Sequence, residues 1–196
     1  MNPALVLDPK TTTFVFLDYQ NGILPRVERP EEVLQRAASV LEAARAAGAG
    51  VVFVRVAFRP GYPEVSDRNS MGSALRATGG LLIDSPETQI VASLAPLATE
   101  PVVVKHRVGA FAGTDLVPIL RARSSETLVL LGIATSGAVL STLRHAADED
   151  YRVVVVEDAC ADADAEVHRV LMEKVFPRQA TVARAEAVAS AIAKGA

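Results

Sequence analysis

The chain has 196 residues, of which half are hydrophobic and 22% charged, and its formal net charge at pH 7 is -3. These values predict one globular domain, residues 1–196, that buries a sizeable core without disulfides or a structural metal. The net charge is weakly negative and no long run of like-charged residues occurs. This argues against a surface that binds nucleic acid or an anionic membrane and favours a small-molecule partner.

The amino terminus, "MNPALVLDPKTTTFVFLD", lacks the basic start, apolar stretch and cleavage site of a secretory signal. No apolar run has the length of a membrane span. A single cysteine, Cys160, excludes an internal disulfide framework. We therefore expect a cytoplasmic protein.

Short apolar runs rich in valine, isoleucine and leucine alternate with longer segments of helical period. The runs cover 13–18, 50–56, 101–107, 127–133 and 151–158, with 179–182 as a candidate last strand. Continuously apolar strands that alternate with helices are typical of a parallel sheet covered on both faces. The sequence thus predicts an α/β fold.

Helical segments fall between or after these runs. They cover 28–50, 84–97, 162–176 and 183–195, and 130–146 reads as a strand that runs into a helix. Pro30 stands where a first helical turn tolerates proline, and Gly48 where a helix ends. In 84–97, Ser85 is a candidate cap and Pro86 takes the first helical position.

Residues 58–84 contain too many glycines, prolines and serines for a strand or a long helix. Long irregular connections inside compact domains are usually lids, binding loops or mobile segments. The alternative is a solvent-exposed loop without a function, and the sequence leaves both interpretations open.

Polar groups follow three of the apolar runs. Asp18 ends the first run, Lys105 follows "PVVV", and a turn of small residues, 132–138, follows the fourth. Carboxyl ends of parallel strands meet at the edge where doubly wound sheets bind ligands, so we expect these groups to lie close together. A desolvated carboxylate and a desolvated ammonium could then pair. In the alternative, Asp18 caps the turn that follows it and Lys105 reaches solvent.

Three segments, "FLDYQNGIL", "VVKHRVGAFAGTDL" and "GIATSGAVLSTLRHAADEDYRVVVVEDACAD", occur in this order. Together they resemble the isochorismatase-like hydrolases, a superfamily of cysteine hydrolases that also holds nicotinamidases and N-carbamoyl amide hydrolases. The resemblance covers nearly the whole chain. It implies a Rossmann-like, three-layer fold with a six-stranded parallel sheet flanked by helices on both faces. It also implies that Asp18 is a general acid/base and that Lys105 orients it and stabilises developing negative charge.

The third catalytic residue of that family departs from the pattern. The family turn reads like "GVATNVCVEST", and alignment with "GIATSGAVLST" puts Ala138 at the position of the nucleophilic cysteine. True isochorismatases also carry a small residue there and cleave a vinyl ether by acid catalysis. We expect Cys160 to be a buried, inert thiol and Ser136 to cap the helix; a serine nucleophile, Ser136 or Ser141, would need a base aimed at its hydroxyl.

The resemblance also assigns residues to substrate or oxyanion binding: Gln20, Phe111, Ala134, Thr135 and Gly137. It implies backbone N–H donors at the turn and a non-proline cis peptide within 133–136. The Asp-x-His motif that nicotinamidases carry after the second strand is missing, because "VRVAFRPGYPEV" holds no histidine. We therefore expect no metal and no other cofactor.

Three hypotheses follow. The first is a thiol-independent hydrolase of a small organic acid that uses Asp18 and Lys105, with Arg55, Arg59 or Arg107 available for a carboxylate. The second is a catalytically silent protein that binds a small molecule. The third is a structural subunit, which retained buried charges disfavour because such charges cost stability. We also expect a homodimer or higher homo-oligomer.

Overall fold

A computed structural model describes residues 5–195, and within that range six parallel strands form one sheet. The strands are β1 (Thr12–Leu17), β2 (Gly50–Val56), β3 (Val102–Lys105), β4 (Thr127–Gly132), β5 (Arg152–Val156) and β6 (Thr181–Ala183). Their order across the sheet is β3-β2-β1-β4-β5-β6. The chain builds outward from β1 in one direction and from β4 in the other, so the switch point lies between these two strands.

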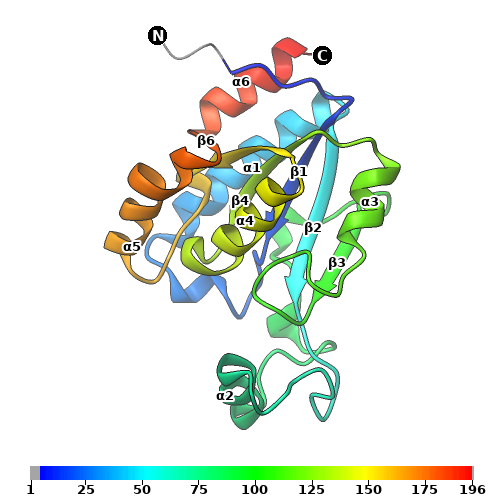
Figure 1. The fold of residues 1–196 in the computed structure, drawn as a ribbon, viewed down its shortest axis with the longest axis vertical. Coiled ribbons are helices and arrows are strands. Elements are labelled where there is room, and N and C mark those ends of the chain that lie inside the picture. Colours follow the sequence, from blue (N-terminus) through cyan, green and yellow to red (C-terminus); the bar gives the residue numbers. More distant parts are fainter. Residues whose placement is uncertain (1–4, 196) are drawn as a thin grey trace.

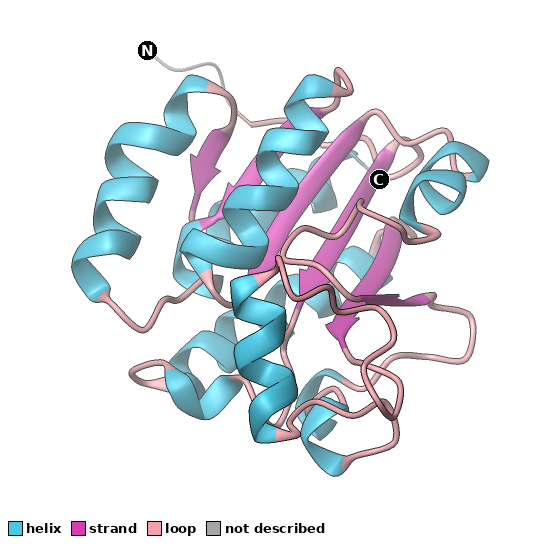
Figure 2. Cartoon of the chain, turned by 60° about the horizontal axis from the view of Figure 1, so that its bottom comes forward, coloured by secondary structure: helices cyan, strands magenta, loops and turns pink. Residues whose placement is uncertain are grey.

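Helices cover both faces of the sheet (Figure 2). They are α1 (Pro30–Ala46), α2 (Ser70–Thr78), α3 (Leu116–Ala122), α4 (Leu140–Asp148), α5 (Ala165–Val170) and α6 (Ala185–Gly195). α1 and α6 pack against each other on one face, and α4 covers the other (Figure 1). The predicted three-layer α/β class is therefore confirmed. No helix within residues 5–195 is long and apolar enough to cross a membrane.

The core lies on both sides of β1 and β4, every residue of which is buried. Phe16 of β1 stacks on Phe53 of β2 with ring centroids 5.0 Å apart. Burying one such side chain contributes about 1.5–3 kcal/mol to folding. This burial fixes the central strands and holds the residues that follow them in place.

The helix predicted over 28–50 is confirmed as α1. Pro30 is its first residue, where its missing N–H has no intrahelical partner in any case. Gly48 lies just past the end with φ of 70°, a left-handed backbone that glycine adopts without steric cost. The candidate strand at 179–182 corresponds to β6.

The helix predicted over 84–97 is wrong. The structure has two 3₁₀ turns there instead, Pro86–Thr88 and Ala92–Leu94. Ser85 makes no capping hydrogen bond. The backbone between the turns pairs with the loop after β1, since the Val91 N–H donates to the Tyr19 carbonyl at 3.0 Å. This tertiary pairing takes the N–H and C=O groups that a helix would have used internally.

Residues 58–84 extend beyond the carboxyl ends of β2 and β3 (Figure 1). They are not wholly irregular, because they contain α2. The Asn69 side chain caps α2 by accepting a 2.9 Å hydrogen bond from the Gly72 N–H. The segment also has its own small apolar cluster, separate from the main core, made of Phe58, Tyr62, Val65 and Leu81.

Candidate active site

The carboxyl edge of the sheet brings Asp18 and Lys105 into contact, as their places at the ends of strands predict. Lys105 Nζ lies 2.8 Å from Asp18 Oδ2, and the two side chains are only 3% and 7% exposed. β1 and β4 flank the switch point, whereas β3 is an edge strand. The Lys105 side chain therefore reaches past the end of β2 to meet Asp18.

Asp18 occupies an uncommon backbone conformation, with φ of 54°. Its N–H continues the sheet by donating to the Val54 carbonyl at 2.9 Å. Its Oδ1 atom is buried and has no hydrogen-bond partner in the described part of the chain. Burial raises the pKa of the Asp18 carboxyl above its usual 3.8, and the charge of Lys105 opposes this rise without cancelling it.

Lys105 uses two of its three N–H groups inside the protein. One donates to Asp18 Oδ2, and another donates to the Arg107 carbonyl at 3.1 Å. An ammonium group has three donors and no acceptor, so one N–H remains for a bound molecule. The pair thus offers one free carboxyl oxygen and one free donor.

Both side chains line a cavity of about 640 Å³ at this edge of the sheet. The turn after β4 contributes Ala134, Ser136, Gly137 and Ala138 to its wall. Apolar residues line much of the rest, including Ile23, Val27, Phe58, Leu75 and Leu81. Several of these come from residues 58–84. This supports the interpretation of the segment as a binding loop over that of a solvent-exposed loop without a function.

The turn after β4 begins where β4 comes very close to β1. Gly132 has φ of 151°, and a Cβ there would lie 2.2 Å from the Leu17 carbonyl oxygen, so only glycine fits. The next peptide, Ile133–Ala134, is cis, as the family resemblance implied. A single π-helical turn, Thr135–Val139, then leads into α4.

Backbone donors of this turn are partly occupied. The Ser136 N–H donates to Asp162 Oδ2 at 2.7 Å, and the Gly137 N–H donates to the Ala134 carbonyl at 3.1 Å. Ala138 N–H has no acceptor outside the turn within residues 5–195. The prediction that Ser136 caps the helix is wrong, because its side chain makes no capping bond and Ala134 is the cap residue.

Gln20 does not line the cavity. Its Nε2 donates to the carbonyls of Val56 and Thr88 at 2.9 and 3.0 Å, and its Oε1 accepts from the Val56 N–H at 2.8 Å. These bonds engage both the nitrogen and the oxygen of the Gln20 amide inside the protein. They tie the loop after β1 to the end of β2, which steadies Asp18.

Phe111 and Thr135 also lie outside the cavity lining. Phe111 stacks on His145 with ring centroids 4.4 Å apart. Thr135 is fully buried, and its Oγ1 lies 2.8 Å from Nδ1 of His168. Of the five residues that the resemblance assigned to binding, the structure therefore brings only Ala134 and Gly137 to the cavity wall.

Cys160 is buried just after β5, at the end of the 3₁₀ turn Glu157–Ala159, and does not line the cavity. Burial raises the pKa of its thiol to about 12. Because the thiolate is the reactive form, this environment makes the sulfur a poor nucleophile. The expectation of a buried thiol is confirmed.

Sequence reasoning missed two contributors to the cavity. Arg26 lines it from the 3₁₀ turn Leu24–Arg26, and α2 lines it through Met71 and Leu75. No local motif marks either of them, because each reaches the cavity only through the path of its loop. Among residues 5–195, no group of three or more His, Cys, Asp or Glu side chains could hold a metal ion.

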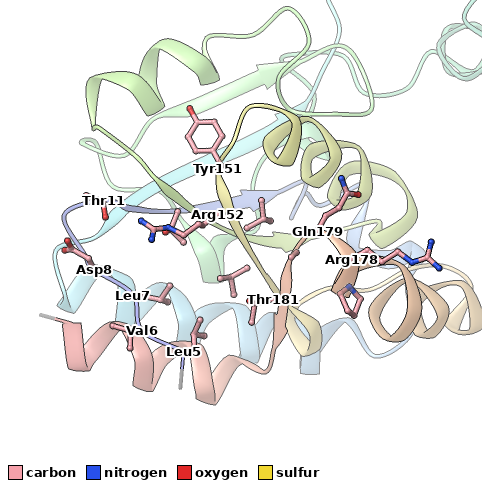
Figure 3. Close-up of a pocket in the computed structure, with 15 residues that line it drawn as sticks. Leu5, Val6, Leu7, Asp8, Thr11, Tyr151, Arg152, Arg178, Gln179 and Thr181 are labelled. Atoms are coloured by element: carbon pink, nitrogen blue, oxygen red, sulfur yellow. The ribbon is translucent and has the colours of Figure 1, made fainter. Parts of the chain in front are cut away.

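A second hollow, of about 700 Å³, lies at the amino ends of β4, β5 and β6 (Figure 3). Arg152, Arg178, Gln179 and Tyr151 line it together with the segment that begins at Leu5. This hollow is of similar volume, but it lies at the opposite edge of the sheet from Asp18. Ligands of open α/β sheets bind at the carboxyl ends of the strands, so the cavity beside Asp18 is the better candidate.

Comparisons with known proteins, by family model, by sequence and by structure, all identify the same family. The family model described as the isochorismatase domain matches residues 12–187. An isochorismatase family protein of Escherichia coli O157:H7 is 36% identical, over 96% of this chain and 100% of its own length. A ureidoacrylate amidohydrolase of Methylobacterium radiotolerans is 33% identical, over 87% of this chain and 75% of its own. A solved isochorismatase family protein of Burkholderia thailandensis superposes with a TM-score of 0.83 at 30% identity, covering 97% of this chain and 99% of that one.

Proposed function

The chain belongs to the isochorismatase family of hydrolases, and we propose that it hydrolyses a small organic molecule through Asp18 and Lys105 without a cysteine nucleophile. One observation carries this proposal. Within residues 5–195, a buried carboxyl with one unpartnered oxygen and a raised pKa lies in a cavity beside a lysine with a free donor. Perturbed, desolvated pairs of this kind are frequent among catalytic acids and bases.

The absence of a thiol from the cavity supports the second half of the proposal. Ala138, which the resemblance aligns with the family nucleophile, lies in the cavity wall, and a methyl group has no lone pair to attack a carbonyl. The single cysteine of the chain, Cys160, is buried elsewhere. These observations favour a route without a covalent thioester.

Acid catalysis fits the two ionisable residues of the pair, Asp18 and Lys105. Protonated Asp18 would deliver its proton to the carbon of an enol ether, and water would add to the resulting oxocarbenium ion and return a proton to the carboxylate. The free N–H of Lys105 would hold an oxygen of the substrate. The hemiketal would then collapse to a carbonyl compound and an alcohol, which completes the hydrolysis.

A second candidate is a catalytically silent protein that binds a small molecule. Ala138 at the nucleophile position favours it as much as it favours a thiol-independent enzyme. A structural subunit is less well supported, because a buried ion pair inside an open cavity costs desolvation energy without stabilising an interface.

A substrate screen separates the first two candidates. The purified protein is incubated with panels of amides, vinyl ethers and esters, and product formation is followed by chromatography. Turnover of a compound is expected for the hydrolase. Binding of several compounds without turnover of any would instead favour the silent binding protein.

We expect any turnover to resist iodoacetamide at pH 8. At that pH a thiol with a pKa of about 12 is ionised in only about 1 molecule in 10⁴. Mass spectrometry of the native protein should show no adduct at Cys160, whereas protein unfolded in guanidinium should be labelled fully. Loss of activity in step with native labelling of Cys160 would contradict the proposal.

The variant Ala138→Cys is the converse test. It restores a thiol beside Asp18 and Lys105, and Asp18 can then accept the thiol proton. We expect the variant to gain amide hydrolysis that iodoacetamide abolishes, with an adduct on Cys at position 138 and none on Cys160. An Ala138→Ser variant of similar size serves as the control and should gain no alkylation-sensitive activity.

A further inference from the structure

We propose that His106 and Glu64 form a proton-dependent latch, which holds residues 58–84 closed over the cavity when the His106 ring carries two protons. The segment contributes Leu75 and Leu81 to the cavity lining, so its position decides how open the cavity is. This inference goes beyond the proposed function, because the latch is measurable on the free protein without a ligand and without turnover.

The segment 58–84 packs on itself. Its apolar cluster of Phe58, Tyr62, Val65 and Leu81 is separate from the main core. Its two ends are tied together, since the Phe58 N–H donates to the Leu81 carbonyl at 2.9 Å and the Ile83 N–H donates to the Phe58 carbonyl at 2.8 Å. A unit with its own small core and a closed neck can shift without opening the main core.

Within residues 5–195, Glu64 makes the one ionic contact that leaves this segment. Three salt bridges involve residues 58–84, and two of them join residues of the segment to each other. The third lies between Glu64 Oε1 and His106 Nε2, which are 3.9 Å apart, and His106 directly follows β3. A change in this contact therefore acts on the attachment of the segment to the rest of the protein.

Glu64 lacks hydrogen-bond donors. Its side chain is 11% exposed, and both carboxylate oxygens are buried without a hydrogen-bond partner among the described residues. Arg59 Nε lies 3.3 Å from Oε1 as a counter-ion, so this arginine, which the sequence offered for a ligand carboxylate, is engaged inside the segment. A buried carboxylate without a donor costs free energy, and a further N–H directed at Glu64 would stabilise the closed segment.

The backbone fixes which nitrogen of His106 carries a hydrogen. Nδ1 lies 2.6 Å from the Ala57 carbonyl oxygen, and because a carbonyl only accepts, Nδ1 is the donor. In the neutral ring Nε2 is then an acceptor, and the nearby Glu64 oxygen gives it nothing to accept. In the protonated ring Nε2 carries a hydrogen, and a movement of about 1 Å brings it to hydrogen-bonding distance from the carboxylate.

The sign of the pH dependence follows from this geometry. The latch forms when the ring gains its second proton at low pH, and it is lost as the pH rises and the ring becomes neutral. The other charged groups on the elements around the ring and the cavity are Arg26, Arg55, Arg59, Lys105, Arg107 and Asp18. Arginine does not titrate in this range, whereas the pKa of Asp18 is raised, so the test must distinguish Asp18 from His106.

Hydrogen–deuterium exchange of the full-length protein at pH 5.5 and pH 8.0, with rates corrected for the intrinsic effect of pH, tests the latch. We expect peptides within residues 58–84 to be about tenfold more protected at pH 5.5, which is the effect of one hydrogen bond between charged groups. Peptides from α1 should show no such difference, which checks that the rest of the fold is unchanged.

Variants assign the effect to residues. His106→Asn keeps a donor for the Ala57 carbonyl but has no atom in the place of Nε2. Glu64→Gln offers an amide that can donate to the neutral ring or accept from the protonated one. Both variants should show equal protection at the two pH values, to within about twofold. The matched control is His145→Asn, because His145 Nε2 lies at the same 3.9 Å from a glutamate, Glu149, and this variant should keep the pH dependence.

The hydrogen position on the ring is a second measurement, and it needs no variant. The ¹⁵N spectrum of the His106 imidazole at pH 8.0 should show a hydrogen on Nδ1 and none on Nε2. Asp18→Asn should keep the pH-dependent protection, since Asp18 is not part of the latch.

Equal protection of the wild type at both pH values would overturn the proposal, as would a hydrogen on Nε2 at pH 8.0. A pH dependence that survives in both His106→Asn and Glu64→Gln, or that disappears in Asp18→Asn, would also overturn it. A pH-dependent latch in a protein that turns over no substrate would uphold this inference and refute only the hydrolase proposal.

Discussion

The variant Asp18→Asn is expected to lower kcat/KM for the best substrate by about 10² to 10⁴. Asparagine keeps the shape of the side chain and can still accept a hydrogen bond from Lys105, but it cannot deliver a proton. The loss should fall on kcat, since the rest of the cavity lining remains. The measurement is steady-state kinetics on the folded variant.

The pH dependence gives an independent readout of the same role. Because burial raises the pKa of Asp18, the carboxyl stays protonated to a higher pH than an exposed aspartate does. Acid catalysis by this group is present below that pKa and falls as the pH rises through it. The falling limb should disappear from the residual activity of Asp18→Asn.

Asp84→Asn is the matched control, because Asp84 is exposed and forms no ion pair in the described part of the chain. It should keep full activity and an unchanged pH profile. An Asp18→Asn variant that retains more than half of the wild-type rate would refute the acid role.

Removal of the Lys105 charge, which pairs with Asp18, is expected to have the largest effect on stability. Lys105→Met keeps the length of the side chain but leaves Asp18 buried without a counter-ion, and removing one member of a buried pair costs about 3–5 kcal/mol. The free energy of unfolding, measured in urea at pH 7, should fall by this amount.

The loss of unfolding free energy in Lys105→Met should depend on pH. Without Lys105, the pKa of Asp18 rises further, and its ionised form is the one that the fold disfavours. At a pH below that raised pKa the carboxyl takes up a proton, so the destabilisation should shrink as the pH is lowered from 7 toward 5.

Two further variants sharpen this result. The double variant, Asp18→Asn with Lys105→Met, should recover part of the lost stability because no buried charge remains. Lys174→Met, at an exposed lysine, should change stability by less than about 0.5 kcal/mol. A Lys105→Met protein as stable as the wild type at every pH would show that the ion pair is not buried in solution.

The helices illustrate what local sequence can and cannot specify. The segment at 28–50 carries a proline start, a glycine end and a clear apolar face, and it forms α1. The segment at 84–97 carries similar start signals but forms two short turns, because its backbone pairs with the loop after β1. Local propensity is a weak signal that tertiary hydrogen bonds can override.

The candidate site also combines residues whose place the sequence predicts with residues whose place it does not predict. Asp18, Lys105 and the turn at 132–138 were predictable, since polar groups at the ends of apolar strands must meet at one edge of a parallel sheet. Gln20, Phe111 and Thr135 were assigned by resemblance alone, and the structure directs their side chains into internal contacts. Residues close in sequence to a site need not face it.

Residue patterns along the chain were enough to predict the α/β class, the parallel sheet and the strand ends that carry Asp18 and Lys105. Residue identity alone shows that position 138 carries no thiol. These follow from patterns that repeat every few residues and from residue identity, both of which are local. Three features of the site depend on how the layers and loops pack. Lys105 reaches past β2 to Asp18, and Asp18 Oδ1 has no partner among residues 5–195. Arg26 and α2 complete the lining of the cavity. The reason is physical: such contacts join residues far apart in the chain, and their geometry depends on how the layers pack and on the paths of long loops, which no short stretch of sequence encodes.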